Sequence, residues 1–145
     1  MTKFVLFRKL EKGQSLTELA ISFVALILIL AVAIDAGRMF LSYLAVREAA
    51  EEGAFYGSIN PTDDSGIINR VRTSSSAPVN LSDTTNVTVV PAVIGDACGN
   101  GTNQLEVTVT YTFELTMPFV SAVIGTNQFP ISLSASSNIL LPDCP

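Results

Sequence analysis

A long apolar run near the N-terminus dominates the pattern of hydrophobic and polar positions. No charged residue lies between Leu19 and Ile34, and the stretch from Gln14 to Asp35 holds about 22 residues. A helix needs roughly 20 apolar residues to cross the hydrocarbon core of a bilayer. The pattern therefore predicts one transmembrane helix over residues 14–36.

Helical character continues beyond this predicted span. Ala, Leu, Glu and Arg are frequent in residues 37–57 and no proline interrupts them, so one rod is expected from Gln14 to about Gly57. Arg47 and Glu51 are spaced to pair across one turn. An apolar stripe that needs cover is expected to comprise Phe40, Leu44, Ala45 and Ala49.

After Tyr56 the composition favours short elements. The segment from Gly57 to Pro61 is expected to end the rod, and the capping residues from Thr62 to Ser65 to begin a short helix that runs through about Arg72. The apolar side of this short helix would comprise Ile67, Ile68 and Val71. A serine-rich loop is predicted next, at residues 74–78.

Three strands are predicted in the remainder of the chain. Residues 86–90 are largely β-branched and end at Pro91, which is typical of a short or edge strand. From Gln104 to Met117 apolar and polar residues alternate, the period-two pattern of a sheet with one dry face. A third strand alternates from Ile131 and ends near Leu140. The predicted fold class is α+β, a long N-terminal helix packed on a small antiparallel sheet of about three strands.

The length of 145 residues allows one small domain outside the membrane. We expect a leader over residues 1–13, the transmembrane helix over 14–36, its extension over 37–57, and an extracytoplasmic α+β domain over 58–145. The leader is basic and should stay in the cytoplasm, with the C-terminal domain outside. Its charged residues are Lys3, Arg8, Lys9 and Lys12 against Glu11.

Glu18 is the candidate functional residue of the span. Placing a carboxylate at mid-membrane costs about 2.5 to 3.5 kcal/mol, and less near the interface. A glutamate in the span is therefore expected to have a charged partner or a functional role. Hydrolysis after Gly13 would supply a partner, because the free α-amine of Gln14, with a pKa of about 8, is mostly cationic at neutral pH. The amine of a neighbouring, axially shifted copy could serve equally well, and would set the register between subunits.

Gly13, Gln14 and Glu18 resemble the class III signal of type IV pilins, in which a prepilin peptidase cuts after glycine and glutamate occupies the fifth mature position. The resemblance implies that the mature chain starts at Gln14. An ordinary secretory signal would be cut after its apolar run, at a small-residue site. No such site closes this run, because the nearest match, Ala31-Val32-Ala33, leads into further helix. An uncut signal-anchor helix with a polar residue near its cytoplasmic end is the alternative.

The following helical segment resembles the TadE/TadG-like minor pilins, or pseudopilins, of tight-adherence (type IVb-related) pilus systems. The positions that match the family pattern are Gly37, Arg38, Phe40, Tyr43, Ala45, Val46, Ala49, Ala50, Glu52, Gly53, Ala54 and Tyr56. Glu51 and Phe55 replace two arginines of that pattern. The resemblance covers Gly13 to about Tyr56. It implies partnership with a major pilin, other minor pilins, an inner-membrane assembly platform and an assembly ATPase.

Two further pairs of residues are candidates for structural roles. Asp35 and Arg38, three residues apart near the outer boundary of the predicted span, are expected to pair or snorkel and to fix the depth of the helix. Cys98 and Cys144 both fall in the external part, where an oxidising compartment permits a disulfide. Closing their loop of about 46 residues would stabilise the domain by roughly 4 kcal/mol in the chain-entropy model. Two free thiols are the alternative.

Composition argues against several other functions. The net charge of -5 makes nucleic acid a poor partner. The chain has no histidine, which excludes a Ser-His-Asp triad and a histidine-bearing metal site. Residues 96–103 are rich in oxygen donors but lack EF-hand spacing, so an ordinary loop is favoured over a calcium site. We expect no cofactor, no small-molecule substrate and no enzymatic activity.

Together these patterns predict a structural minor pilin that is cut by a prepilin peptidase and takes part in assembly of a tight-adherence pilus or a related secretion pseudopilus. It would lie in the inner membrane or be extracted into a cell-surface pilus. One alternative is an uncleaved single-pass membrane protein with an extracytoplasmic binding module. The other is a major filament subunit. Leu19 and the sizeable domain disfavour it, because tight-adherence major pilins resemble very short chains with tyrosine after the glutamate.

Overall fold

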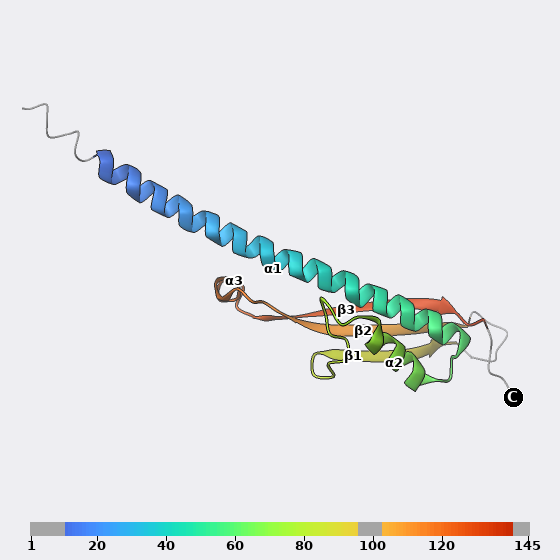
Figure 1. Cartoon of the computed structure of the whole chain (residues 1–145). Helices are drawn as coiled ribbons and strands as arrows, with labels where there is room; N and C mark the ends of the chain where they lie inside the picture. The colour runs from blue at the N-terminus through green and yellow to red at the C-terminus, as the bar shows by residue number, and fades with distance from the viewer. Residues whose placement is uncertain (1–10, 96–102, 141–145) are drawn as a thin grey trace, which may run out of the picture.

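The computed structural model describes residues 11–95 and 103–140 and combines a long helix with a small sheet. Its elements in chain order are α1 (Glu11–Ile59), α2 (Asp64–Ser74), β1 (Val87–Ile94), β2 (Gln104–Glu114), α3 (Pro118–Ile124) and β3 (Gln128–Asn138). The predicted α+β class is confirmed, since α1 packs along the three-stranded antiparallel sheet (Figure 1).

Helix α1 is a single rod of 49 residues, about 73 Å long at 1.5 Å per residue. It begins at Glu11 and ends at Ile59, slightly beyond the predicted rod at both ends. The backbone N–H of Asn60 still donates to Tyr56, and Pro61, which has no N–H, follows directly. The N-terminal half of α1 extends past the sheet, whereas the C-terminal half lies alongside it (Figure 1).

Small side chains form the face of α1 that packs on the domain. At Gly57 a side chain would collide with Leu105 of β2 and crowd Ile67 of α2. At Gly53 a Cβ would lie 2.5 Å from a methyl group of Val71. The backbone of α1 therefore approaches its neighbours more closely than any larger residue allows. The buried residues of this face are Ser42, Ala45, Val46, Ala49, Ala50, Gly53, Ala54, Gly57 and Ser58.

The predicted stripe on this helix is partly wrong. Ala45 and Ala49 are buried as expected and Leu44 is half-buried, but Phe40 is 60% exposed. Phe40 and Ala45 are five positions apart in the sequence, which places the two about 140° apart around the helix. Phe40 therefore faces away from the sheet.

The sheet has the order β1-β2-β3, with β2 in the centre. Val109 of β2 lies opposite Val89 of β1 and Leu133 of β3. The alternation predicted for the central strand is confirmed, because its apolar residues are buried toward the helices: Leu105, Val107, Val109 and Phe113. The outer face carries hydroxyl groups, which pair across strands as Thr108 with Ser134 and Thr110 with Ser132.

Pro91 does not end the first strand, contrary to the prediction. Strand β1 continues to Ile94, with Pro91 opposite Val107. Because β1 is at the edge of the sheet, one of its sides makes no ladder hydrogen bonds. A residue without an N–H is therefore tolerated there.

The prediction that the central strand reaches Met117 is also wrong. Strand β2 ends at Glu114, and the chain then turns into α3, which the sequence analysis did not predict. Pro118 suits the first turn of a helix, where its missing N–H has no partner to lose. Gly125 closes α3 in the left-handed conformation, with φ of 83° and its N–H donating to Ser121. Strand β3 then begins at Gln128, earlier than expected.

Helix α2 lies between α1 and β1 and completes the core. Asp63 caps it, accepting a hydrogen bond of 2.9 Å from the N–H of Gly66. Ile67 and Val71 are fully buried and Ile68 is half-buried, as the sequence predicted for one side of this helix. The hydrophobic core thus lies between the C-terminal half of α1, helix α2 and the sheet, and these elements form one domain.

Candidate functional site

The N-terminal half of α1 is an apolar surface that the rest of the described chain leaves open. In the segment 13–34, Ala31 alone is buried. A helix that is apolar all round needs a non-aqueous environment, and α1 is the one helix among the described residues that is long and apolar enough to span a membrane. Its large exposed residues are Leu16, Leu19, Ile21, Phe23, Val24, Leu26, Ile27, Leu28, Ile29, Leu30, Val32 and Ile34.

Glu18 and the predicted cleavage residues lie together at the start of this surface. The side-chain amide of Gln14 donates to a carboxylate oxygen of Glu18 over 3.1 Å. The two residues are four apart and therefore share one face of the helix. Gly13, where a side chain would meet no atom within 4 Å, lies one residue before Gln14. Both the carboxylate and the predicted scissile bond are thus accessible from outside the chain.

At the other end of the apolar surface, Asp35 is nearly fully buried, with 2% of its side chain exposed. Its carboxylate pairs with Arg38 at 3.4 Å, the pairing that their spacing predicted. It also accepts hydrogen bonds from the backbone N–H groups of Met117, at 3.1 Å, and Thr116, at 3.4 Å. Asp35 therefore fastens α1 to the turn between β2 and α3, a contact that local sequence does not reveal.

Arg38 strengthens the same junction from the surface. Its guanidinium donates to the hydroxyl of Thr116 and lies over the ring of Phe113, 5.5 Å from the ring centre. A guanidinium at this distance from an aromatic face is attracted to it. The pair of Asp35 and Arg38 thus binds the domain to α1, and its role in fixing membrane depth stays a prediction.

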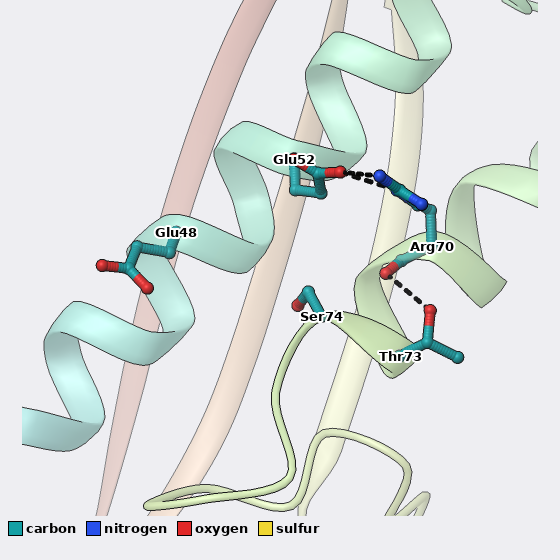
Figure 2. Close-up of a pocket in the computed structure, with 5 residues that line it drawn as sticks. All are labelled: Glu48, Glu52, Arg70, Thr73 and Ser74. Atoms are coloured by element: carbon teal, nitrogen blue, oxygen red, sulfur yellow. Dashed lines mark hydrogen bonds and ion pairs between the residues drawn. The ribbon is translucent and has the colours of Figure 1, made fainter.

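Further along α1, Glu52 joins the helix to α2. Its carboxylate accepts a hydrogen bond of 2.6 Å from Nε of Arg70, and a second guanidinium nitrogen completes the ion pair. Figure 2 shows Glu52 turned toward Arg70, whereas the carboxylate of Glu48 points away from it. These residues, with Thr73 and Ser74, line an open cleft of about 360 Å³. The cleft is a seam between two helices that one ion pair bridges.

Tyr56 and Gly53 belong to the same seam. Gly53 lies against Val71 of α2, and the hydroxyl of Tyr56 donates to the carboxylate of Asp63 over 3.1 Å. That hydrogen bond raises the pKa of Tyr56. The pKa of Asp63 is lowered, first by the N–H of Gly66 and then by the hydroxyls of Ser65 and Tyr56. The family-pattern residues Glu52, Gly53 and Tyr56 therefore all serve contact with α2.

Tyr43 and Gly37 occupy less enclosed positions. Tyr43 is 39% exposed and lines a shallow cleft against β3 together with Arg47 and Glu51. Arg47 and Glu51 form the predicted ion pair at 2.8 Å, and its hydrogen bond raises the pKa of Arg47. A side chain at Gly37 would meet no atom within 4 Å. Gly37 is therefore not required for packing within this chain.

Cys98 and Cys144 lie outside the described residues, and so does most of the oxygen-rich segment 96–103. The disulfide between these cysteines stays a prediction.

Comparison with known families gives a match that lies within α1 and covers parts of both its halves. Residues 13–54 match the family model described as TadE-like protein. This segment is TadE-like. The resemblance stated from the sequence is thereby confirmed for α1, and no curated protein and no solved structure matches the chain. The TadE-like match begins at Gly13 and ends before α2, so it coincides with the long helix and leaves out the sheet.

The TadE-like segment therefore contains both kinds of surface. Its first part carries Glu18 and the open apolar residues, and its last part carries the small residues that pack under the domain. The sequence predicted Glu18 and the apolar run of the first part, but of the packed face it predicted only Ala45 and Ala49 to be covered. Arg70 on α2 and the turn at Thr116 and Met117 were not predicted as partners, because they lie 18 to 82 residues from Glu52 and Asp35. Asp63 was predicted only as a helix cap and not as the partner of Tyr56.

Proposed function

We propose that this protein is a structural minor pilin of a tight-adherence pilus or a related secretion pseudopilus. The observation that carries the proposal is the open apolar half of the TadE-like helix, with Glu18 beside Gln14 at its start. Such a surface is stable in lipid or against other apolar helices, and not in water. The role is one of assembly, with no enzymatic step and no cofactor.

In this proposal the newly made chain is first inserted into the inner membrane. The basic leader stays in the cytoplasm, the apolar half of α1 spans the bilayer, and the sheet domain is held outside. A prepilin peptidase then cuts between Gly13 and Gln14. The new α-amine of Gln14 is cationic at neutral pH and lies about one helical turn from Glu18.

Cleavage prepares the helix for assembly. Glu18 of one subunit attracts the Gln14 amine of a neighbouring subunit, because opposite charges interact strongly where water is scarce. That pairing sets the register, and the apolar residues of adjacent helices then replace lipid as neighbours. The partners of the chain in this scheme are a major pilin, other minor pilins and the inner-membrane assembly platform. The domain faces outward.

The test is co-expression with a prepilin peptidase and the partner pilins, comparing the parent with Glu18→Ala and Glu18→Gln. We expect all three to lose the leader, as mass spectrometry of the N-terminus would detect. Only the parent should co-purify with other pilins in full yield, since Gln keeps the shape of Glu without its charge. Glu51→Gln, which changes an exposed glutamate on the same helix outside the span, is the matched control and should assemble normally.

A second candidate function is a membrane-anchored binding module. The observation that favours it is the outer face of the sheet, where the exposed hydroxyls of Thr108, Thr110, Ser132 and Ser134 form an uncovered polar surface. In that case the leader would not be removed. A purified membrane protein that starts at Met1 and binds no other pilin would support this function against the pilin proposal.

A further inference from the structure

Helix α3 presents apolar side chains that nothing in the described chain covers. Phe119 is 60% exposed, Val123 88% and Ile124 53%. The helix lies at the end of the β2–β3 hairpin that points toward the N-terminal half of α1 (Figure 1). No charged residue occurs between Leu115 and Leu140, so neither the helix nor its flanks carry a charge.

Contacts with α1 place α3 at the level of the predicted outer membrane boundary. The N–H groups of Thr116 and Met117, just before α3, donate to the buried carboxylate of Asp35. Helix α3 contacts α1 directly, and Ala31 is 6% exposed in a segment whose other described residues, from 13 to 34, are all exposed. Helix α3 therefore stands beside the last turns of the apolar surface.

The depth of α3 relative to the predicted span is that of a helix at the membrane interface. Ala31 lies four residues before Asp35, or about 6 Å along the axis of α1. Apolar faces of interfacial helices enter the boundary between headgroups and acyl chains by about 5–10 Å. If Asp35 marks the outer end of the span, α3 falls within this layer. Its apolar residues are then continuous with the lipid-facing surface of α1.

We propose that α3 is a second membrane contact, which inserts Phe119, Val123 and Ile124 among the lipids of the outer leaflet. The contact fixes the depth and rotation of the domain before assembly. Its partner is phospholipid acyl chain rather than an anionic headgroup, because α3 and its flanks lack lysine and arginine. This inference rests on the proposed membrane orientation of α1.

The absence of tryptophan from the chain permits a direct measurement of depth. A single tryptophan is introduced as Val123→Trp, at a position exposed enough to accept it without repacking. The matched control is Val90→Trp, in a valine of β1 that is 52% exposed. A third variant, Leu26→Trp, reports on the span itself. Each full-length protein is reconstituted in phosphatidylcholine vesicles with and without lipids brominated along the acyl chains.

We expect brominated lipid to quench most of the emission of Val123→Trp and of Leu26→Trp, and to leave Val90→Trp unchanged. Bromine near the headgroup should quench Val123→Trp more than bromine near the bilayer centre. Quenching of Leu26→Trp alone would overturn the second contact while leaving the span intact. A blue-shifted but unquenched Val123→Trp would overturn it too, since protein would then cover α3. An unquenched Leu26→Trp would overturn the membrane orientation on which both proposals rest.

Discussion

The two halves of α1 are parts of one uninterrupted helix but are built for different neighbours. Between residues 13 and 34 every residue except Ala31 is exposed, and most of the exposed side chains are large and apolar. Between residues 42 and 58 the buried face carries Gly, Ala, Ser and one Val. Close approach of a sheet and a second helix requires small residues, whereas lipid and partner helices conform to large ones. Side-chain size along α1 therefore indicates what covers each half.

Asp35 and Arg38 stand where the two halves meet. Asp35 is buried by the turn that leads into α3, and Arg38 lies over Phe113 of the sheet. The junction thus holds a buried carboxylate, which the described residues of neither half contain. The division of α1 predicts that a substitution in the packed half, or in a residue that packs against it, has a larger effect on stability than a similar substitution elsewhere in the helix.

Truncating a large apolar side chain should give the largest difference in the free energy of unfolding between the packed and the open half of α1. Leu105→Ala, under α1, should lower the free energy of unfolding of the domain by about 2–5 kcal/mol, because it leaves a cavity. Leu26→Ala, in the exposed half, should leave that free energy unchanged. Urea unfolding of the full-length proteins in detergent, followed by near-ultraviolet circular dichroism, measures both. Equal losses would contradict the comparison.

Adding a methyl group to a glycine should have the next largest effect. Gly57→Ala forces a side chain against Leu105 and should cost about 1–3 kcal/mol. Gly37→Ala meets no atom within 4 Å and should be neutral or slightly stabilising, since alanine favours helix. Thermal unfolding of the pair is the measurement. A stable Gly57→Ala variant would mean that α1 can move away from the sheet.

Breaking the junction should have a similar but more local effect. Asp35→Ala leaves the N–H groups of Met117 and Thr116 without their acceptor, at a cost of about 1–3 kcal/mol. Hydrogen exchange should rise at the end of β2 and in α3, and much less elsewhere in the domain. Asp35→Asn keeps one acceptor oxygen and should fall between the parent and Asp35→Ala. Glu48→Ala, on the exposed side of α1, should leave exchange unchanged.

Acid should weaken the domain through Asp63, with the smallest effect of the set. Hydrogen bonds hold the pKa of Asp63 below its ordinary value of 3.8. Between the folded and the unfolded pKa the unfolded chain therefore binds more protons. This contribution to stability, complete above about pH 5, is lost as the pH falls through the folded pKa. Asp63→Asn should flatten the decline in melting temperature below about pH 5. Asp64→Asn is the matched control, and an equal flattening would contradict the role of the cap.

Much of this architecture could be predicted because its signals are local. The apolar run, the unbroken helical stretch and the alternation from Gln104 onward each lie within one segment, and these three signals correctly predicted α1 and β2. The ends of elements were less predictable. Pro91 was expected to end β1, but whether a proline is tolerated depends on the strand being at the edge, which is set by the order of strands.

Partners across the fold could not be predicted at all. Asp35 was expected to pair with Arg38, and it does, but its burial depends on a turn some 80 residues later in the chain, at Thr116 and Met117. Helix α3 is too short for a helical periodicity to emerge, and its apolar residues follow directly on an alternating strand. Phe40 was misplaced because the face that meets the sheet is chosen by packing and not by hydrophobicity.

The most direct test of the central claim is photo-crosslinking from the open half of α1. A photo-reactive amino acid is placed at Leu26 in cells that contain the prepilin peptidase and the partner pilins. The account predicts a chain that starts at Gln14 and cross-links through Leu26 to another pilin, and loss of that cross-link when the peptidase is absent. A chain that retains Met1 and cross-links to no pilin in the complete system would contradict the account.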